Sequence, residues 1–162
     1  MTRVFAPGRI EVLGKHTDYA GGRSLLAAVD VGVTATLTEG NQAGLTISSD
    51  ATQDTVQITS GSPPIGHWAT YAATVWHRLQ RNFGELPPSR IHLTSTLPLA
   101  SGMSSSSALV VAVADALVAH YDLDSRPEFA ENIDSVEARA EYYGCIENGQ
   151  SFRSLAWQAR LG

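Results

Sequence analysis

A serine-rich loop that leads directly into an apolar segment constrains this chain more than any other feature. Residues 98–108 read PLASGMSSSSA, and the apolar and small residues of 109–119 follow without a break. We expect a loop that opens straight into a buried helix. The first turn of a helix offers free N–H groups and the positive end of the helix dipole, which together bind anions. The segment therefore predicts a phosphate-binding loop.

The residue types in this loop suit that prediction. Gly102 lets the backbone come close to a ligand, and the serines at 104–107 supply small hydroxyls that cap a helix or hold a metal ion. The loop is not a Walker loop, because it has no Gly-Lys-Ser/Thr. A flexible serine-rich linker is the alternative interpretation, but a long apolar segment does not normally follow a linker at once.

Composition limits the classes of protein to which this chain can belong. The chain has 162 residues, of which 43% are hydrophobic and 17% charged, enough for a single ordered domain with a sizeable core. A net charge of -5 argues against nucleic acid as a partner. Cys145 is the only cysteine, so no internal disulfide forms. No stretch has the length of a membrane span and the N-terminus has no signal-peptide pattern, so we expect a cytoplasmic protein without a membrane partner.

Hydrophobic periodicity predicts a mixed fold. Alternation indicates strands, and a period of three to four indicates helices. Ala6-Pro7-Gly8 is expected to interrupt the first apolar segment. The expected strands are 9–13, 25–37, 45–48, 55–59 and 90–97, and the expected helices are 67–83, 109–119, 125–144 and a short one within 151–161. This order predicts an α+β domain of two layers, with a mostly antiparallel sheet and helices on one face.

Two of these helices carry more detailed expectations. In 67–83, the aromatic residues Trp68 and Tyr71 share the helical repeat of Ala72, Val75 and Leu79, so we expect them in the core and not on a base-stacking surface. In 125–144, a capping box at Ser125–Glu128 is expected to start the helix and Gly144 to end it. Its inner stripe is expected to comprise Phe129, Ile133, Val136, Ala140 and Tyr143.

A second polar loop lies near the N-terminus. Residues 14–22 read GKHTDYAGG, with Arg9 shortly before them. Asp18, in a loop bracketed by glycines, is suited to accept hydrogen bonds from sugar hydroxyls, although an Asx-turn is an equal alternative. Taken alone, His16 is more often structural and Arg9 more often a surface cation.

Together, the two loops resemble a known family. Residues 6–22, APGRIEVLGKHTDYAGG, resemble the N-terminal signature of galactokinases. Residues 98–108 are similar to the second motif of the small-molecule kinases for galactose, homoserine, mevalonate and phosphomevalonate. The resemblance covers residues 4 to about 146. It implies a ribosomal protein S5 domain 2-like fold and ATP-dependent phosphorylation of the anomeric hydroxyl of galactose or a related sugar.

The resemblance also implies roles for individual residues. Arg9 would be catalytic, lying near the transferred phosphoryl group. The substrate-binding residues would be Lys15, His16, Asp18 and Gly22. The ATP phosphates would be wrapped by Ser101, Gly102, Met103, Ser104, Ser105 and Ser106. Magnesium would be held by Ser106 and Glu141, although Glu141 is equally interpretable as an exposed helix carboxylate.

Three departures from the family pattern qualify these roles. Glu11 replaces the usual asparagine, and Lys15 replaces a glutamate that contacts the O6 hydroxyl of the sugar. A cation at position 15 would suit a uronic acid or another non-galactose sugar, unless Lys15 points to solvent. The family segment that carries the catalytic aspartate is not reproduced. Its nearest counterpart, residues 144–150, offers Glu147 or Asn148, so the base is either Glu147 or a residue beyond Gly162.

Family members are considerably longer and have a second domain. We therefore expect residues 1–162 to be a single N-terminal sugar- and ATP-binding domain without the family's C-terminal domain. An apolar face left open by that domain would favour a homo-oligomer. The alternative function is a catalytically inactive sugar- or nucleotide-binding module of the same fold. An RNA-binding domain of similar fold is disfavoured by the net charge.

Overall fold

Five strands form one sheet in the computed structural model, which describes residues 1–14, 21–59, 63, 66–98 and 104–156. The strands are β1 (Thr2–Leu13), β2 (Leu25–Glu39), β3 (Leu45–Ser49), β4 (Asp54–Ile58) and β5 (Ser89–Ser95). Their spatial order is β1-β2-β5-β3-β4. Neighbouring strands are antiparallel except for β3 and β5, which run parallel. The predicted, mostly antiparallel sheet is confirmed.

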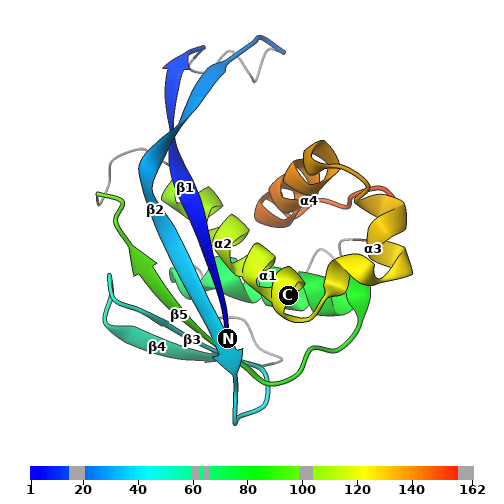
Figure 1. The fold of residues 1–162 in the computed structure, drawn as a ribbon. Coiled ribbons are helices and arrows are strands. Elements are labelled where there is room, and N and C mark those ends of the chain that lie inside the picture. The colour runs from blue at the N-terminus through cyan, green and yellow to red at the C-terminus, as the bar shows by residue number, and fades with distance from the viewer. Residues whose placement is uncertain (15–20, 60–62, 64–65, 99–103, 157–162) are drawn as a thin grey trace.

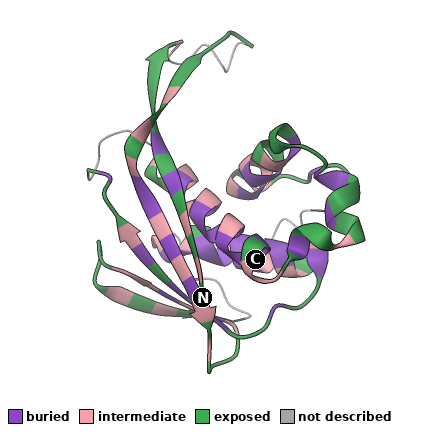
Figure 2. Cartoon of the chain, viewed as in Figure 1, coloured by how far each residue is buried: buried purple, intermediate pink, exposed green. Residues whose placement is uncertain are grey.

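The helices cover one face of this sheet (Figure 1). They are α1 (Ala69–Phe83), α2 (Ser105–His120), α3 (Pro127–Asn132) and α4 (Val136–Asn148), with a short 3-10 turn, η2, at Leu123–Ser125. The helix α2 packs on β1 and β2, and α1 and α4 pack beside it. Burial is concentrated between these layers (Figure 2). The α+β fold with two layers is therefore confirmed. In the described residues, no helix has the length and apolar character that crossing a membrane requires.

The first strand is longer than expected. β1 continues through Ala6-Pro7-Gly8, where we predicted a break. Because β1 is an edge strand, it pairs with β2 alone, so the missing N–H group of Pro7 affects the hydrogen bonds of at most one strand pair. The pairing register with β2 shifts between Pro7 and Arg9, so the strand bends there instead of ending.

Beyond this shift, β1 and β2 form a ribbon of two strands that stands clear of the helices (Figure 1). We call it the β1–β2 arm: residues 9–13 of β1 and 25–28 of β2. Arg9 pairs with Ala28, Ile10 with Ala27, Glu11 with Leu26 and Leu13 with Leu25. Almost all of the arm is exposed (Figure 2), because no helix packs against it.

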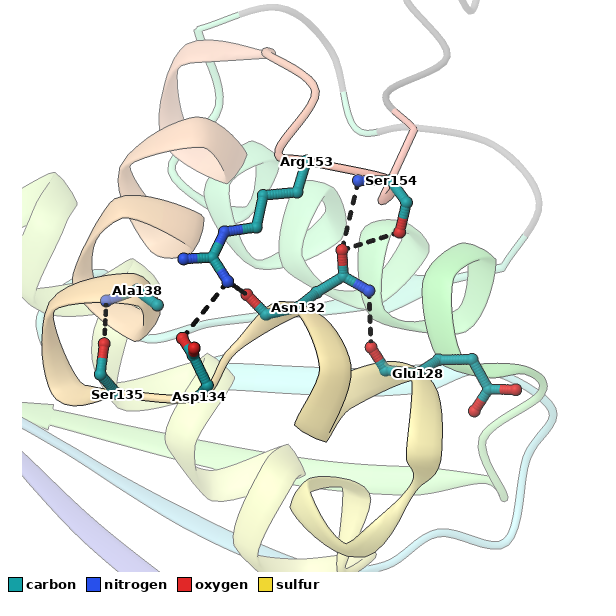
Figure 3. A network of polar contacts seen from close by, with 7 residues as sticks. All are labelled: Glu128, Asn132, Asp134, Ser135, Ala138, Arg153 and Ser154. Atoms are coloured by element: carbon teal, nitrogen blue, oxygen red, sulfur yellow. Dashed lines mark hydrogen bonds and ion pairs between the residues drawn. The ribbon is translucent and has the colours of Figure 1, made fainter.

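The predicted helix 125–144 is two helices. Residues 133–135 separate α3 from α4, and Ser135 caps α4 by accepting a hydrogen bond from the Ala138 N–H at 3.1 Å. Arg153 donates to the Asn132 carbonyl at 2.7 Å, and the Ser154 hydroxyl donates to the Asn132 side chain at 2.7 Å (Figure 3). These contacts hold the end of α3 against the segment after α4, so the chain cannot continue as one helix.

The predicted ends of that helix are also wrong. α3 begins after Arg126 without a side-chain cap, so the expected capping box at Ser125–Glu128 does not form. Gly144 lies inside α4, which ends at Asn148 with Gly149 in the left-handed conformation. Residues 151–156 make a turn closed by a bridge between Phe152 and Leu155 in place of the expected short helix. The rest of that expected helix lies outside the described residues.

Candidate functional site

The predicted phosphate loop leads into the N-terminus of α2. The helix begins at Ser105, inside the serine run, and its residues from Ala112 to Val118 are almost all buried, as expected. Ser104 lies before it in the left-handed conformation (φ 54°, ψ 52°), and its hydroxyl makes no capping hydrogen bond. The first intrahelical bond is donated by the Ala108 N–H to the Ser104 carbonyl. The N–H groups of the preceding turn have no acceptor within the helix, so they suit an anion.

Two cavities flank this turn. The first, which we call the apolar cavity, has a volume of about 360 Å³ and is lined by Ser105 and Ser106 together with mainly apolar side chains. Those side chains include Val33, Trp68, Tyr71, Leu93, Leu97 and Leu109. The second, which we call the arginine cavity, has a volume of about 240 Å³ and is lined by Arg9, Ser104 and Ser107. Successive serines of one helical turn thus face two different cavities.

The apolar cavity contains two aromatic residues that we had expected in the core. Ala72, Val75 and Leu79 are indeed buried, but Tyr71 is 40% exposed and Trp68 is only half-buried. The indole Nε1 of Trp68 is nonetheless shielded from solvent and has no hydrogen-bond partner in the described part of the chain. Helical periodicity missed this role because both residues share the core repeat. Their position at the very start of α1 was the available signal.

The arginine cavity joins the two sequence motifs. Arg9 lies at the base of the β1–β2 arm, is exposed, and lines the cavity opposite Ser104 and Ser107 of α2. Ala6 and Pro7 of β1 and Ala108 and Val111 of α2 complete the lining. A cation from the first motif therefore faces the helix N-terminus of the second, which places two features that attract anions on one small cavity.

A carboxylate from α4 reaches the same turn. The Ser107 hydroxyl donates a hydrogen bond to Glu147 at 2.8 Å, and Glu147 is half-buried. One turn earlier on α4, the Tyr143 hydroxyl donates to Asp115 of α2 at 2.6 Å. Burial, followed by the neighbouring Asp115 charge, raises the pKa of Tyr143 far above its ordinary range. These two hydrogen bonds fix one face of α4 against α2.

Glu141 does not belong to this face. It is exposed and makes no hydrogen bond or ion pair with the described residues. At about 100° per residue, the six positions between Glu141 and Glu147 turn the side chain about 240° around the helix axis. Glu147 is therefore the α4 carboxylate that the structure brings to the serines. No group of three or more His, Cys, Asp or Glu side chains that could hold a metal ion occurs in the described ranges.

Among the remaining predicted site residues, Gly22 alone belongs to the described part of the chain. Gly22 lies just before β2 and is exposed. Lys15, His16, Asp18, Ser101, Gly102 and Met103 lie outside the described residues.

Comparisons with known proteins match the same two motifs. Residues 70–146 match the family described as GHMP kinases N terminal domain, and residues 2–38 match the galactokinase galactose-binding signature. The galactokinase of Thermotoga neapolitana is 33% identical over 119 residues, which cover 74% of this chain and 33% of that protein. The chain therefore spans about a third of the length of that relative.

Solved structures share the fold. The mevalonate kinase of Methanococcus jannaschii superposes with a TM-score of 0.71 at 15% identity, covering 92% of this chain and 47% of that one. The galactokinase of Lactococcus lactis, complexed with galactose, superposes with a TM-score of 0.64 at 23% identity, covering 88% of this chain and 38% of that one. The chain therefore has the ribosomal protein S5 domain 2-like fold of GHMP kinases.

Proposed function

This chain is a galactokinase-like member of the GHMP kinase family, and on that premise we propose that it is the nucleotide- and sugar-binding part of a kinase that transfers the γ-phosphoryl group of ATP to the anomeric hydroxyl of galactose or a related sugar. The observation that carries the proposal is the position of the first turn of α2 between two cavities of different chemistry.

The two cavities suit the two ends of ATP. The apolar cavity has the exposed ring of Tyr71 and the indole N–H of Trp68, which has no partner among the described residues, so it suits a flat base that carries hydrogen-bond acceptors. The free N–H groups between the cavities suit the phosphates. The γ-phosphate then lies in the arginine cavity, where Arg9 stabilises the charge that develops during transfer.

Transfer is direct in this proposal. The anomeric oxygen of the sugar attacks the γ-phosphorus in line, the bond to the oxygen that bridges the β- and γ-phosphates breaks, and ADP leaves. The hydroxyl proton passes to a base, which is Glu147 only where that carboxylate does not hold magnesium and is otherwise a residue beyond Gly162. Arg9 stabilises charge on the phosphoryl group and does not serve as the base, because its guanidinium stays protonated at physiological pH.

Magnesium fits the oxygen groups at the start of α2. A hydroxyl and a single carboxylate suit a hard cation that keeps most of its water ligands. Ser106 is the hydroxyl suggested by family resemblance and lines the apolar cavity. Glu147 is bonded to Ser107, which lines the arginine cavity, so an ion held by both residues would lie at the turn between the two cavities. We propose Ser106 and Glu147 as the magnesium-binding pair, in preference to the exposed Glu141. When bound, the ion would neutralise charge on the phosphates.

The sugar is proposed to bind at the loop of Lys15, His16 and Asp18, with Gly22 shaping the pocket. Lys15 stands where galactokinases have a glutamate for the O6 hydroxyl, so an acidic sugar such as a uronic acid is the favoured substrate. A phosphorylation panel tests this choice: galactose outperforming every acidic sugar would refute it. Replacing Lys15 by Glu should shift preference towards galactose.

Two further proposals concern the chain as a whole. The family's C-terminal domain is proposed to complete the site, and an ATP-dependent kinase of this kind is expected in the cytoplasm. The second candidate function is a sugar- or nucleotide-binding module without turnover, which the missing catalytic-aspartate segment favours.

Calorimetry separates binding from catalysis. Titration of MgATP should give saturable binding at one site per chain, and a coupled assay with the sugar panel should then detect ADP if the chain is a competent kinase. Binding without ADP release fits the module, and repeating the assay with the family's C-terminal domain supplied then tests whether turnover appears. The absence of nucleotide binding would refute the kinase, and the absence of both nucleotide and sugar binding would refute both functions.

A further inference from the structure

The outer edge of β1 carries a short segment that is complementary to itself. β1 is the first strand in the sheet order, so one of its edges has no neighbouring strand in the described part of the chain. Along the arm, the register with β2 is regular only from Arg9 to Glu11, with shifts between Pro7 and Arg9 and between Glu11 and Leu13. An open edge of this kind presents unpaired backbone N–H and C=O groups to another strand.

The side chains of this segment are exposed and apolar or oppositely charged. Ile10 is 42% exposed, and Val12, Leu13, Leu25 and Leu26 are more exposed still. Arg9 and Glu11 are exposed and form no ion pair within the described residues. They lie two positions apart on one face of the strand, with Cα atoms about 7 Å from each other.

We propose that this edge binds a second copy of the chain by antiparallel pairing of β1 about a two-fold axis at Ile10. In this register Ile10 faces Ile10 of the second copy, and Arg9 of each copy faces Glu11 of the other. Directly opposite side chains have Cβ atoms about 5 Å apart, so each charged residue gains an oppositely charged partner in the second copy. Leu13 of each copy meets Pro7 of the other.

Charge complementarity selects a second copy as the occupant. A two-fold interface brings the same patch together from both copies, so charged residues in the patch favour self-association only where opposite charges meet across the axis. The order Arg9-Ile10-Glu11 satisfies that condition, since the axis at Ile10 places each charge opposite its complement. The regular stretch is short, so the dimer is expected to be weak and dependent on concentration. This inference goes beyond the proposed function and does not depend on it.

Charge reversal tests the pairing by sedimentation velocity over a range of concentrations. Glu11→Arg replaces two attractive pairs by two repulsive ones, and dimerisation should weaken by about tenfold. Combining it with Arg9→Glu restores opposite charges and should return the dimerisation constant to within about twofold of the original. Glu39→Arg, an equal charge change at the far end of β2, should have no effect. A monomer at every concentration, or a double variant as weak as Glu11→Arg, would overturn the proposal.

Cross-linking tests the register. In a Cys145→Ser background, Ile10→Cys places two thiols across the axis at a spacing that a disulfide can bridge. Mild oxidation should convert it largely to covalent dimer. Leu26→Cys is a matched control, because Leu26 is 49% exposed in the same arm but lies on the inner strand. Equal cross-linking of both variants, or none of Ile10→Cys, would contradict the two-fold register.

Discussion

The Ser107 hydroxyl on α2 donates a hydrogen bond to Glu147 on α4 across 2.8 Å, which brings a carboxylate to the first turn of the helix that follows the serine-rich loop. Forty residues separate the two in sequence. The contact makes Glu147, and not Glu141, the α4 carboxylate nearest the proposed phosphate site.

Replacing Glu147 tests its role with magnesium. Glu147→Gln should weaken MgATP binding about tenfold, equivalent to ~1.4 kcal/mol, because the amide carries no charge for the cation. Glu141→Gln is the matched control and should change affinity by less than about twofold, since Glu141 is exposed. Calorimetry with EDTA in place of magnesium should abolish the difference. Equal effects of both variants would exclude the proposed pair.

Arg9 should distinguish ATP from ADP. Arg9→Ala removes a guanidinium that lines the arginine cavity, where the γ-phosphate is proposed to lie. ATP affinity should fall about tenfold and ADP affinity should stay within about twofold, because ADP lacks the group that Arg9 contacts. Arg9→Lys should recover part of the loss, since it keeps the charge without the planar fork. A similar loss for both nucleotides would place Arg9 elsewhere.

High pH should destabilise the fold through two buried tyrosines. Burial raises the pKa of Tyr142 well above its ordinary value, and burial together with Asp115 does the same for Tyr143. Above pH 10 both residues ionise in the unfolded chain but not in the folded one. The free energy of unfolding should therefore fall by about 1.4 kcal/mol per pH unit for each tyrosine.

Urea denaturation at several pH values above 10 measures this slope. Tyr143→Phe should reduce it by about half, because only Tyr142 then contributes. Tyr71→Phe is the control for the loss of a tyrosine hydroxyl, since Tyr71 lies at the surface. A stability that does not change with pH over this range would show that neither hydroxyl is shielded from water.

Two glycines with similar backbone angles should differ in their tolerance of a methyl group. Gly44 (φ 86°) lies before β3, and a Cβ there would overlap the Ile58 carbonyl oxygen across the β3–β4 hairpin. At Gly21 (φ 71°), no atom of the described residues lies within 4 Å of an added Cβ. Gly44→Ala should cost at least about 3 kcal/mol, and Gly21→Ala only the backbone strain of about 1 kcal/mol. Thermal denaturation compares the two, and equal costs would contradict the close packing at Gly44.

Local pattern predicted the regular elements but not the break between α3 and α4. The apolar stripe of Phe129, Ile133 and Tyr143 keeps a helical period through residues 133–135, yet Val136 from the same stripe is 81% exposed. The break depends on Arg153 and Ser154, which hold Asn132 from about twenty positions away. No local periodicity contains that information.

The sequence also predicted part of the candidate site and missed the part that depends on packing. The serine run and Arg9 were identified from their motifs, and the structure places both on one cavity. Tyr71 was assigned to the core because periodicity cannot distinguish a buried helix position from one that faces a cavity. The Ser107–Glu147 contact depends on how α4 packs on α2, which tertiary structure alone reveals.

Chemical-shift mapping with MgATP tests the central claim most directly, because it locates the nucleotide. We expect the largest shifts at the backbone amides of residues 104–107 and at the Trp68 indole N–H, with smaller shifts near Arg9. The cavity of about 370 Å³ beside Arg81, Asn132 and Ser154 is an internal control of similar size and should show none. Shifts gathered at that cavity, or no saturable shift at the start of α2, would contradict the account.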